Sequence, residues 1–425
     1  MLSGEQIYKI AEELFPICRS ITGDGVRETF RILQKHVPEL MVYEVPTGTN
    51  VFDWTVPREW KINAAYIENE AGERIIDFKN NNLHVLGYSA PMDEYLSLDE
   101  LKQIVYTQKD QPDVIPYVTS YYKERSGFCM SQNQFDSLEE GTYHCVIDSA
   151  LFEGSLTYGE LILKGKSTKE ILFSTYVCHP SMANNECSGP ALAVALMRYL
   201  QEMKEREFTY RFVIVPETIG SITYLSQNYM VMKENIYAGF NLSCVGDDRE
   251  YSFVATKYGN TVTDRVLRHV LSKHAPHYVE YSFLERGSDE RQYNAPGIDL
   301  PVCGFSRTKY GKYPEYHTSA DDLTVISAAG FAGALNIMTK CIQVLEHNHY
   351  YKVQVLCEPQ LGKRGLYPTI SQKGSYDSIQ DLTNFITYTD GTNSLVDIAE
   401  RIGADALNLI PIVNKLMDNG LVAYE

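Results

Sequence analysis

Hydrophobic positions recur at helical spacing in two segments near the start of the chain, residues 5–17 and 26–36. Between about residues 40 and 125 the pattern changes to short alternating segments separated by turn residues. This alternation predicts a small β-rich module. One helix is expected inside the module, because Ser97 and Glu100, three residues apart, have the spacing of a capping box.

Apolar runs of strand length alternate with longer helical segments from about residue 140 to 350. Strands that are apolar throughout are typical of a sheet covered on both faces. The alternation therefore predicts an α/β fold with a parallel or mixed sheet and helices on both faces. The expected strands are 171–180, 210–218 and 237–245, and the expected helices are 188–205, 220–234 and 261–275.

The last part of the chain follows a segment rich in Pro and Gly at 358–374. It holds a helical pattern that begins at Asn393 and a second one over 406–419, which together read as a helix-turn-helix. Residues 376–425 contain 8 acidic and 2 basic side chains, a net charge of −6. Because duplex DNA attracts basic surfaces, we expect this segment to pack on the core or to mediate dimerisation.

Composition narrows the class of protein. The 425 residues include 38 basic and 55 acidic side chains, so the net charge of −17 disfavours nucleic acid and anionic membranes as partners. We expect no signal peptide and no membrane span, and nine scattered cysteines without a CxxC pair favour the cytoplasm. The 31 Tyr against 2 Trp suit sugar binding, although drift in composition explains them more readily.

Polar loops follow the predicted strands, and active groups of open α/β sheets gather where strands end. His179 follows the first strand, with Glu186 seven residues later, and Glu217 follows the second. His and carboxylate side chains are typical ligands of catalytic zinc, and a carboxylate also suits a general base. Two later loops, 287–293 and 316–322, carry further polar groups. Taken singly, each loop also fits helix capping or a structural histidine.

The order of these motifs resembles the zinc-dependent aminopeptidases that use two co-catalytic metals on an α/β sheet. The resemblance implies a three-layer fold, a mixed sheet with helices on both faces. It assigns the first metal-binding His to His179, the helix-opening motif to 185–189 and the general base to Glu217. It also assigns the late Gly-Ser-Asp loop to 287–289 and the last His to His317.

Over its whole length the chain looks like a group of bacterial proteins whose names refer to polysaccharide biosynthesis. The stretches that carry this likeness are 52–60, 82–84, 116–122 and 360–367. The likeness implies three domains: an aminopeptidase-like core, an inserted β-rich domain and a C-terminal winged-helix domain, at 1–40 with 130–355, at 41–129 and at 356–425.

The sequence departs from the two-metal pattern at four positions. Asn185 replaces the bridging Asp, Thr218 the second Glu, Ser243 the third-loop Asp, and Ser181 the Asp that orients the first His. An amide binds zinc poorly and cannot neutralise two close dications. The resemblance therefore implies one Zn²⁺ ion rather than two.

Two hypotheses follow. In the first, His179, Glu186 and His317 hold one zinc and Glu217 is the catalytic base of an amide hydrolase that acts on a peptide-like or amino-sugar substrate. The residues expected to contact that substrate are Asn185, Asp289, Glu290, Arg291 and Tyr316. In the second, the chain is a non-catalytic relative that binds a carbohydrate intermediate or a partner protein. Formation of a homo-oligomer stays open.

Overall fold

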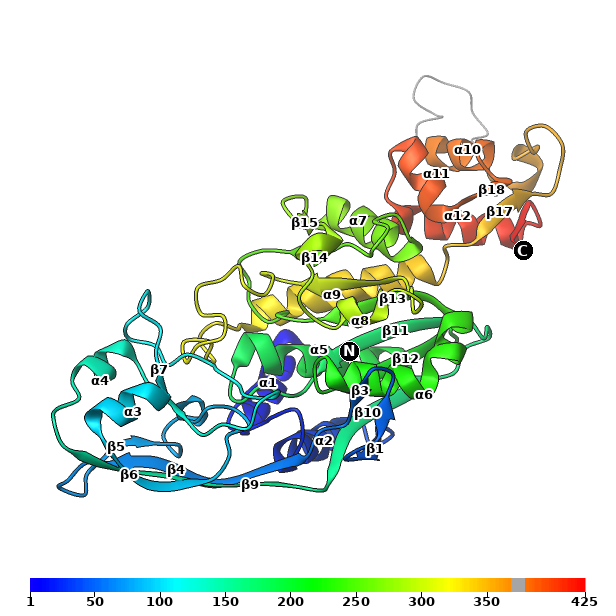
Figure 1. Cartoon of the computed structure of the whole chain (residues 1–425). Coiled ribbons are helices and arrows are strands. Elements are labelled where there is room, and N and C mark those ends of the chain that lie inside the picture. The colour runs from blue at the N-terminus through cyan, green and yellow to red at the C-terminus, as the bar shows by residue number, and fades with distance from the viewer. Residues whose placement is uncertain (368–378, 425) are drawn as a thin grey trace. The chain divides into compact units, whose positions relative to one another are not determined.

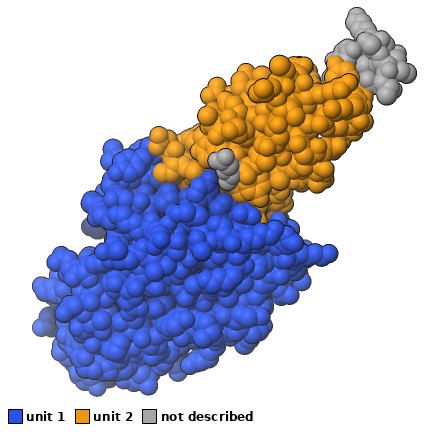
Figure 2. All heavy atoms as spheres, turned by 90° about the vertical axis from the view of Figure 1, so that its right-hand side faces the viewer, with its two compact units in different colours: residues 1–259, 279–335 blue, residues 260–278, 336–425 orange. Residues whose placement is uncertain are grey.

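The computed structural model describes residues 1–367 and 379–424. Their contacts divide the chain into two compact units (Figure 2). Unit 1 comprises residues 1–259 and 279–335, and unit 2 comprises 260–278 and 336–425. All the predicted site residues fall in unit 1. The predicted domain boundaries, which follow a different division, stay a prediction.

Unit 1 is built on a mixed sheet of eight strands in the order β1-β10-β12-β11-β13-β16-β14-β15 (Figure 1). Strands β12, β11, β13 and β16 run parallel, whereas β1 and β10 at one side and β14 at the other join in antiparallel fashion. This confirms the predicted mixed α/β architecture. The bounds are β1 Met41–Pro46, β10 Ser155–Leu163, β11 Glu170–Tyr176, β12 Thr209–Val215, β13 Ile236–Leu242, β14 Ser252–Val254, β15 Val279–Tyr281 and β16 Val302–Ser306.

Strand β11 shows how both faces of the sheet are covered, because neighbouring side chains on a strand point to opposite faces. On one face, the hydroxyls of Ser174 and Tyr293 of α8 (Glu290–Tyr293) lie 2.7 Å apart. On the other, Thr175 lies against Gly189 of α5 (Ser188–Glu202), where an added Cβ would meet the Thr175 Oγ1 at 2.1 Å. Every residue of β11 is buried.

Helices α1, α2 and α6 and the first part of α9 also belong to unit 1. Helix α1 (Gly4–Leu14) opens with a capping box on Ser3, and α2 (Asp24–His36) and α6 (Ile219–Asn235) match the predicted helical segments. In the part of the chain that the structure describes, one helix is long and apolar enough to cross a bilayer. It is α9 (Ala328–Leu345), with a mean hydropathy of 1.3 over 18 residues. Most of that window is buried, as is typical of a helix in a protein core.

A second sheet, antiparallel throughout, has the order β5-β4-β9-β6. Its strands are β4 Glu59–Glu68, β5 Arg74–Asp77, β6 Met92–Ser97 and β9 Thr142–Phe152. Only two residues separate β9 from β10, so one stretch of chain runs from this sheet into the main one (Figure 1). The predicted helix is α3 (Leu98–Ile104), and its capping box between Ser97 and Glu100 is confirmed.

Short elements complete unit 1. They are the hairpin of β2 (Asn50–Val51) and β3 (Trp54–Thr55), the parallel pair β7 (Val105–Tyr106) and β8 (Phe128–Cys129), helix α4 (Gln132–Asp136), and the 3₁₀ turns at Asn82–His84 and Phe283–Glu285. All nine cysteines lie in the described residues, and each is a free thiol.

Unit 2 confirms the predicted helix-turn-helix and adds strands to it. Helices α10 (Gln380–Thr387), α11 (Leu395–Ile402) and α12 (Ala406–Asp418) accompany a sheet of order β18-β17-β19. The remaining elements are α7 Val262–His274, β17 Tyr350–Val353, β18 Asp390–Ser394, β19 Val422–Tyr424 and a 3₁₀ turn Gly362–Arg364. Of the predicted loop at 358–374, residues 368–374 lie outside the described residues.

Unit 2 should lose stability in mild acid. His269 of α7 is 4% exposed, and its Nε2 accepts the Ala406 N–H at the start of α12 at 3.0 Å. Burial lowers the pKa of His269, although Asp405 opposes this. A histidine whose pKa in the folded state lies below the unfolded value of about 6.5 adds fully to the free energy of unfolding above that pH. This stabilisation is lost as the pH falls through the folded pKa.

Urea unfolding at pH 7.5 and 5.5 measures this loss. We expect a smaller loss in the His269→Gln variant, because glutamine accepts the same hydrogen bond without titrating. An identical pH dependence in the two proteins would show that His269 is not responsible.

Candidate functional site

His179 is fixed by a carboxylate on one side of its ring. Its Nδ1 lies 3.0 Å from Oε2 of Glu186, and that oxygen also accepts the backbone N–H groups of His179 and Cys178. Glu186 lies in a π-helical turn, Ala183–Cys187, which leads into α5. A carboxylate on Nδ1 fixes the orientation of a histidine and leaves its Nε2 free for a ligand.

Arg19, which the sequence analysis did not single out, lies against the same carboxylate. Its Nε is 2.9 Å from Oε1 of Glu186, and both side chains are 1% exposed. The guanidinium also donates to the carbonyl oxygen of His179 and to Thr29. The charge of Glu186 is therefore balanced inside the protein, on the side of His179 away from Nε2.

Glu217 follows β12, as predicted, and faces the other nitrogen of His179. Its Oε2 is 3.8 Å from the Nε2 of His179, and its Oε1 accepts a hydrogen bond of 2.7 Å from Ser288. Burial raises the pKa of Glu217 above its ordinary value. Burial alone would lower the pKa of His179, but Cys178, Glu186 and Glu217 outweigh it and hold the pKa well above the usual range.

His317 comes to the same place from the late loop. Its ring centroid lies 5.4 Å from that of His179, and Tyr117 packs against both rings at 5.3 and 4.9 Å. The Tyr117 N–H donates to the carbonyl of His317. Burial, followed by the charge of His179, lowers the pKa of His317 to about 3. Its Nε2 is buried and has no hydrogen-bond partner among the described residues.

Two of the predicted substrate-contacting residues lie beside these groups. Tyr316 stacks on His317 with 3.9 Å between ring centroids. Asn185 donates to the Tyr176 hydroxyl at 2.6 Å, and its buried Oδ1 has no partner within the described part of the chain.

The other three predicted substrate-contacting residues, Asp289, Glu290 and Arg291, bond to backbone and side-chain groups around Glu217. Asp289 accepts the Thr218 N–H and the Ser221 hydroxyl. Burial, then the charge of Glu217, raises the pKa of Asp289 to about 7. Glu290 accepts the Ser288 N–H, and Arg291 donates to Thr218. These contacts fix Thr218, which follows Glu217, and Ser288, which donates to it. The geometry therefore favours a supporting role for Asp289, Glu290 and Arg291 over contact with substrate.

A cavity of about 180 Å³ opens onto His179 and Glu217. Aromatic rings form much of its wall, and sequence reasoning placed none of these rings near the site. The lining residues are Ile21, Trp54, Thr55, Pro57, Tyr117, Tyr121, Tyr122, Cys178, His179, Glu217, Thr218 and Ile219.

The backbone around this cavity is strained. Thr218, which lines the cavity, has a positive φ of 66°, and so do Ser181 (39°), Cys244 (53°) and His317 (58°) in the loops that follow β11, β13 and β16. Such conformations persist only where the surrounding structure enforces them, and they concentrate at functional sites. The strain supports the same location that the motifs predict.

Several donor atoms at the site could hold a cation. His317 Nε2 and Asn185 Oδ1 are buried atoms without a partner among the described residues, and His179 presents Nε2 beside Glu217. Cys178, His179 and Glu186 form another group with donor atoms within 4.8 Å of one another. Arg19 already neutralises Glu186 there, which disfavours a second cation at that group.

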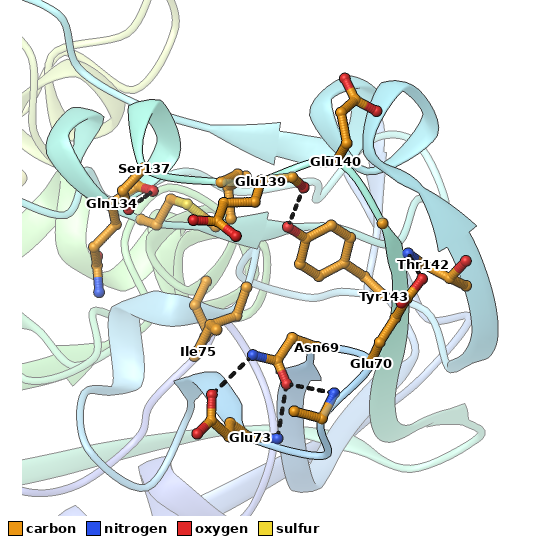
Figure 3. A pocket seen from close by; sticks show the side chains of 15 residues that line it. Asn69, Glu70, Glu73, Ile75, Gln134, Ser137, Glu139, Glu140, Thr142 and Tyr143 are labelled. Carbon is orange, nitrogen blue, oxygen red and sulfur yellow. Dashed lines mark hydrogen bonds between the residues drawn. The ribbon is translucent and has the colours of Figure 1, made fainter.

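A separate cavity of about 490 Å³ lies between the β4–β5 turn and the segment after α4 (Figure 3). Four exposed glutamates line it, Glu70, Glu73, Glu139 and Glu140. Hydrogen bonds of turns occupy part of this wall, such as the one from Asn69 to Glu73 (Figure 3). None of the predicted site residues reaches it, so it is distinct from the candidate site.

Comparison with solved structures supports this fold. A zinc aminopeptidase from Bacillus subtilis matches 80% of this chain and 95% of its own, with 13% identity and a TM-score of 0.60. A crystal structure from Clostridium acetobutylicum, named as a peptidase, matches 99% of this chain and 96% of its own, with 44% identity and a TM-score of 0.93. Unit 1 therefore has an aminopeptidase-like fold.

The family follows from sequence. A family described as a domain of unknown function (DUF4910) matches residues 8–348, and the chain belongs to it. A winged helix-turn-helix family matches residues 348–424. A Clostridium acetobutylicum protein, named for polysaccharide biosynthesis and an aminopeptidase-like domain, is 47% identical over 406 residues, 95% of this chain and 92% of its own.

Proposed function

We propose that the protein is a hydrolase that uses one zinc ion to cleave an amide bond. The observation that carries the proposal is the pairing of Glu217, held by Ser288, with the free Nε2 of His179 at one cavity. His179 and His317 would hold the ion and Glu186 would brace His179, with the Asn185 amide, a poor zinc ligand, nearby. This revises the sequence-based ligand set, in which Glu186 was itself a ligand.

Zinc in such a site supplies a polarised carbonyl and an acidified water. Glu217 takes a proton at its carboxylate and returns it to the leaving nitrogen, and its raised pKa brings it closer to neutral pH for this exchange. Ser288 holds the carboxylate in place, and Glu186 holds Nδ1 of His179. The aromatic wall beside the carboxylate can accommodate the substrate.

The proposed substrate is a neutral amide on an amino sugar or a short peptide. The name of the 47% identical relative, which refers to polysaccharide biosynthesis, supports the amino sugar. Tyr and Trp rings suit it because they stack on the apolar face of a sugar.

A metal measurement tests the proposal. Protein purified without chelator should contain close to one zinc per chain, and His317→Ala should lower the zinc content and abolish hydrolysis of aminoacyl and N-acetylamino-sugar amides. The exposed His277 provides a matched control, because His277→Ala should leave both unchanged. Absence of zinc from the native protein, with no uptake by the metal-free form, would end the proposal.

A non-catalytic binding protein is the second candidate. Asn185, Thr218 and Ser243 stand where the resembled enzymes have carboxylates, and Arg19 neutralises Glu186. Zinc-free protein that still binds amino sugars at the cavity would favour this candidate.

A further inference from the structure

Trp54 separates two cavities. It lines the site cavity of about 180 Å³, and it also lines a neighbouring cavity of about 420 Å³. The second cavity reaches α6 at Ile222 and the chain after α8 at Ile298, and Phe52 and Tyr229 contribute rings to it. The two cavities are therefore neighbours that share the Trp54 side chain as a wall.

The rings at this boundary are exposed. Trp54 is 37% exposed, Phe52 54% and Tyr122 81%. Trp54 meets Tyr122 edge-on at 5.9 Å, and Phe52 meets Tyr229 edge-on at 5.8 Å. Large rings gathered at cavity mouths, outside the core, are typical of a surface that binds a ligand.

The charges around the two cavities restrict the ligand. Neither set of lining residues contains Lys or Arg, whereas Asp53 and Glu217 are acidic. A phosphate or nucleotide would meet no lysine or arginine in either cavity, and Asp53 would repel it from the second one. Hydroxyl and amide groups of Thr55, Tyr121 and Gln292 can hydrogen-bond to a neutral polar ligand.

We propose that the two cavities together bind a neutral oligosaccharide of at least two sugar rings. One ring lies in the site cavity beside His179 and Glu217, and the next lies in the second cavity against Trp54 and Phe52. Sugars combine apolar ring faces, which stack on aromatic side chains, with hydroxyls that hydrogen-bond at their edges. The proposal deepens the proposed function by naming its substrate class, and it rests on that function only for the position of the first ring.

Tryptophan fluorescence tests the proposal, since the chain has only two tryptophans and the other, Trp60, is 4% exposed. The emission of Trp54 is followed during titration with N-acetylglucosamine and its β-1,4-linked dimer and trimer. We expect the dimer to change the emission and to bind about tenfold more tightly than the single sugar, a difference of about 1.4 kcal/mol.

Substitutions locate the second ring. Phe52→Ala should weaken the dimer and leave the single sugar unchanged, whereas Trp54→Ala should weaken both, as measured by calorimetry. Tyr95→Ala, at a side chain that is 72% exposed and lines neither cavity, should change neither affinity. Equal affinities for one and two rings, absence of sugar binding, or tighter binding of an alkyl detergent or a short peptide would overturn the proposal.

The outcome is independent of catalysis. Glu217→Gln should still bind the dimer, and so should protein from which zinc has been removed. Oligosaccharide binding without zinc or hydrolysis would leave this proposal standing and end only the proposed enzyme function. Hydrolysis of a peptide amide without sugar binding would do the reverse.

Discussion

Replacing Arg19 with methionine is expected to lower the free energy of unfolding by about 3–5 kcal/mol. Arg19 and Glu186 are each 1% exposed, and the guanidinium is the positive charge beside the carboxylate. Methionine fills much of the same volume but leaves Glu186 charged and buried without its partner. Urea unfolding of the wild type and Arg19→Met, with equal slopes, measures the difference.

Two further variants separate the pair from its surroundings. Arg31→Met removes a guanidinium that is 61% exposed and paired with Glu28, so we expect a loss of about 0–1 kcal/mol. Arg19→Met combined with Glu186→Gln should regain part of the lost stability, because the buried carboxylate charge is removed while an amide oxygen can still accept the N–H groups of Cys178 and His179. A loss in Arg19→Met as small as that of Arg31→Met would contradict the assignment.

Replacing Glu217 with glutamine should reduce kcat about 10²–10⁴-fold, the usual contribution of a general base. Glutamine keeps the shape of the side chain and can accept the hydrogen bond from Ser288, but it cannot take up the proton. Zinc content and unfolding midpoint should match the wild type, because neither depends on that proton. Turnover of the best amide substrate from the hydrolysis panel gives the readout.

The exposed Glu153 provides the control for that experiment, since Glu153→Gln changes the same functional group away from the site. It should keep full activity. Retention of activity in Glu217→Gln, with zinc still bound, would assign the base to another residue.

Much of the fold could be predicted because its elements are periodic. The helix predicted at 188–205 is α5 (Ser188–Glu202), and the strand predicted at 210–218 is β12 (Thr209–Val215). Strand ends were predicted three or four residues too long, since the apolar run continues into the loop that follows each strand. A strand that is buried on both faces of a sheet is apolar along its whole length, so its own sequence is enough to predict it.

The site was less accessible to sequence reasoning. The motifs placed His179, Glu217 and His317 together, but the pairing of Arg19 with Glu186 joins parts of the chain that are far apart. No local pattern encodes such a contact. The turn signals around Arg19 could have marked its loop, yet nothing in them indicates that the guanidinium points inward.

Tyr117 shows the same difficulty for the inserted module. The sequence gives an aromatic run, and only the fold brings its first ring against both histidines. The backbone of the module makes this possible, since Pro116 and Thr318 form an antiparallel bridge and Ile115 and Ser319 exchange hydrogen bonds.

Two links tie this module to the rest of unit 1: the bridge between Pro116 and Thr318, and the short connection from β9 to β10. We therefore expect that the module cannot be exchanged between relatives as an independent unit. A chimera that imports only the four-stranded sheet would keep the host's histidine loop without the strand that pairs with it. If the proposed function holds, grafts of this module should retain it only when residues 115–121 and 316–319 come from the same parent.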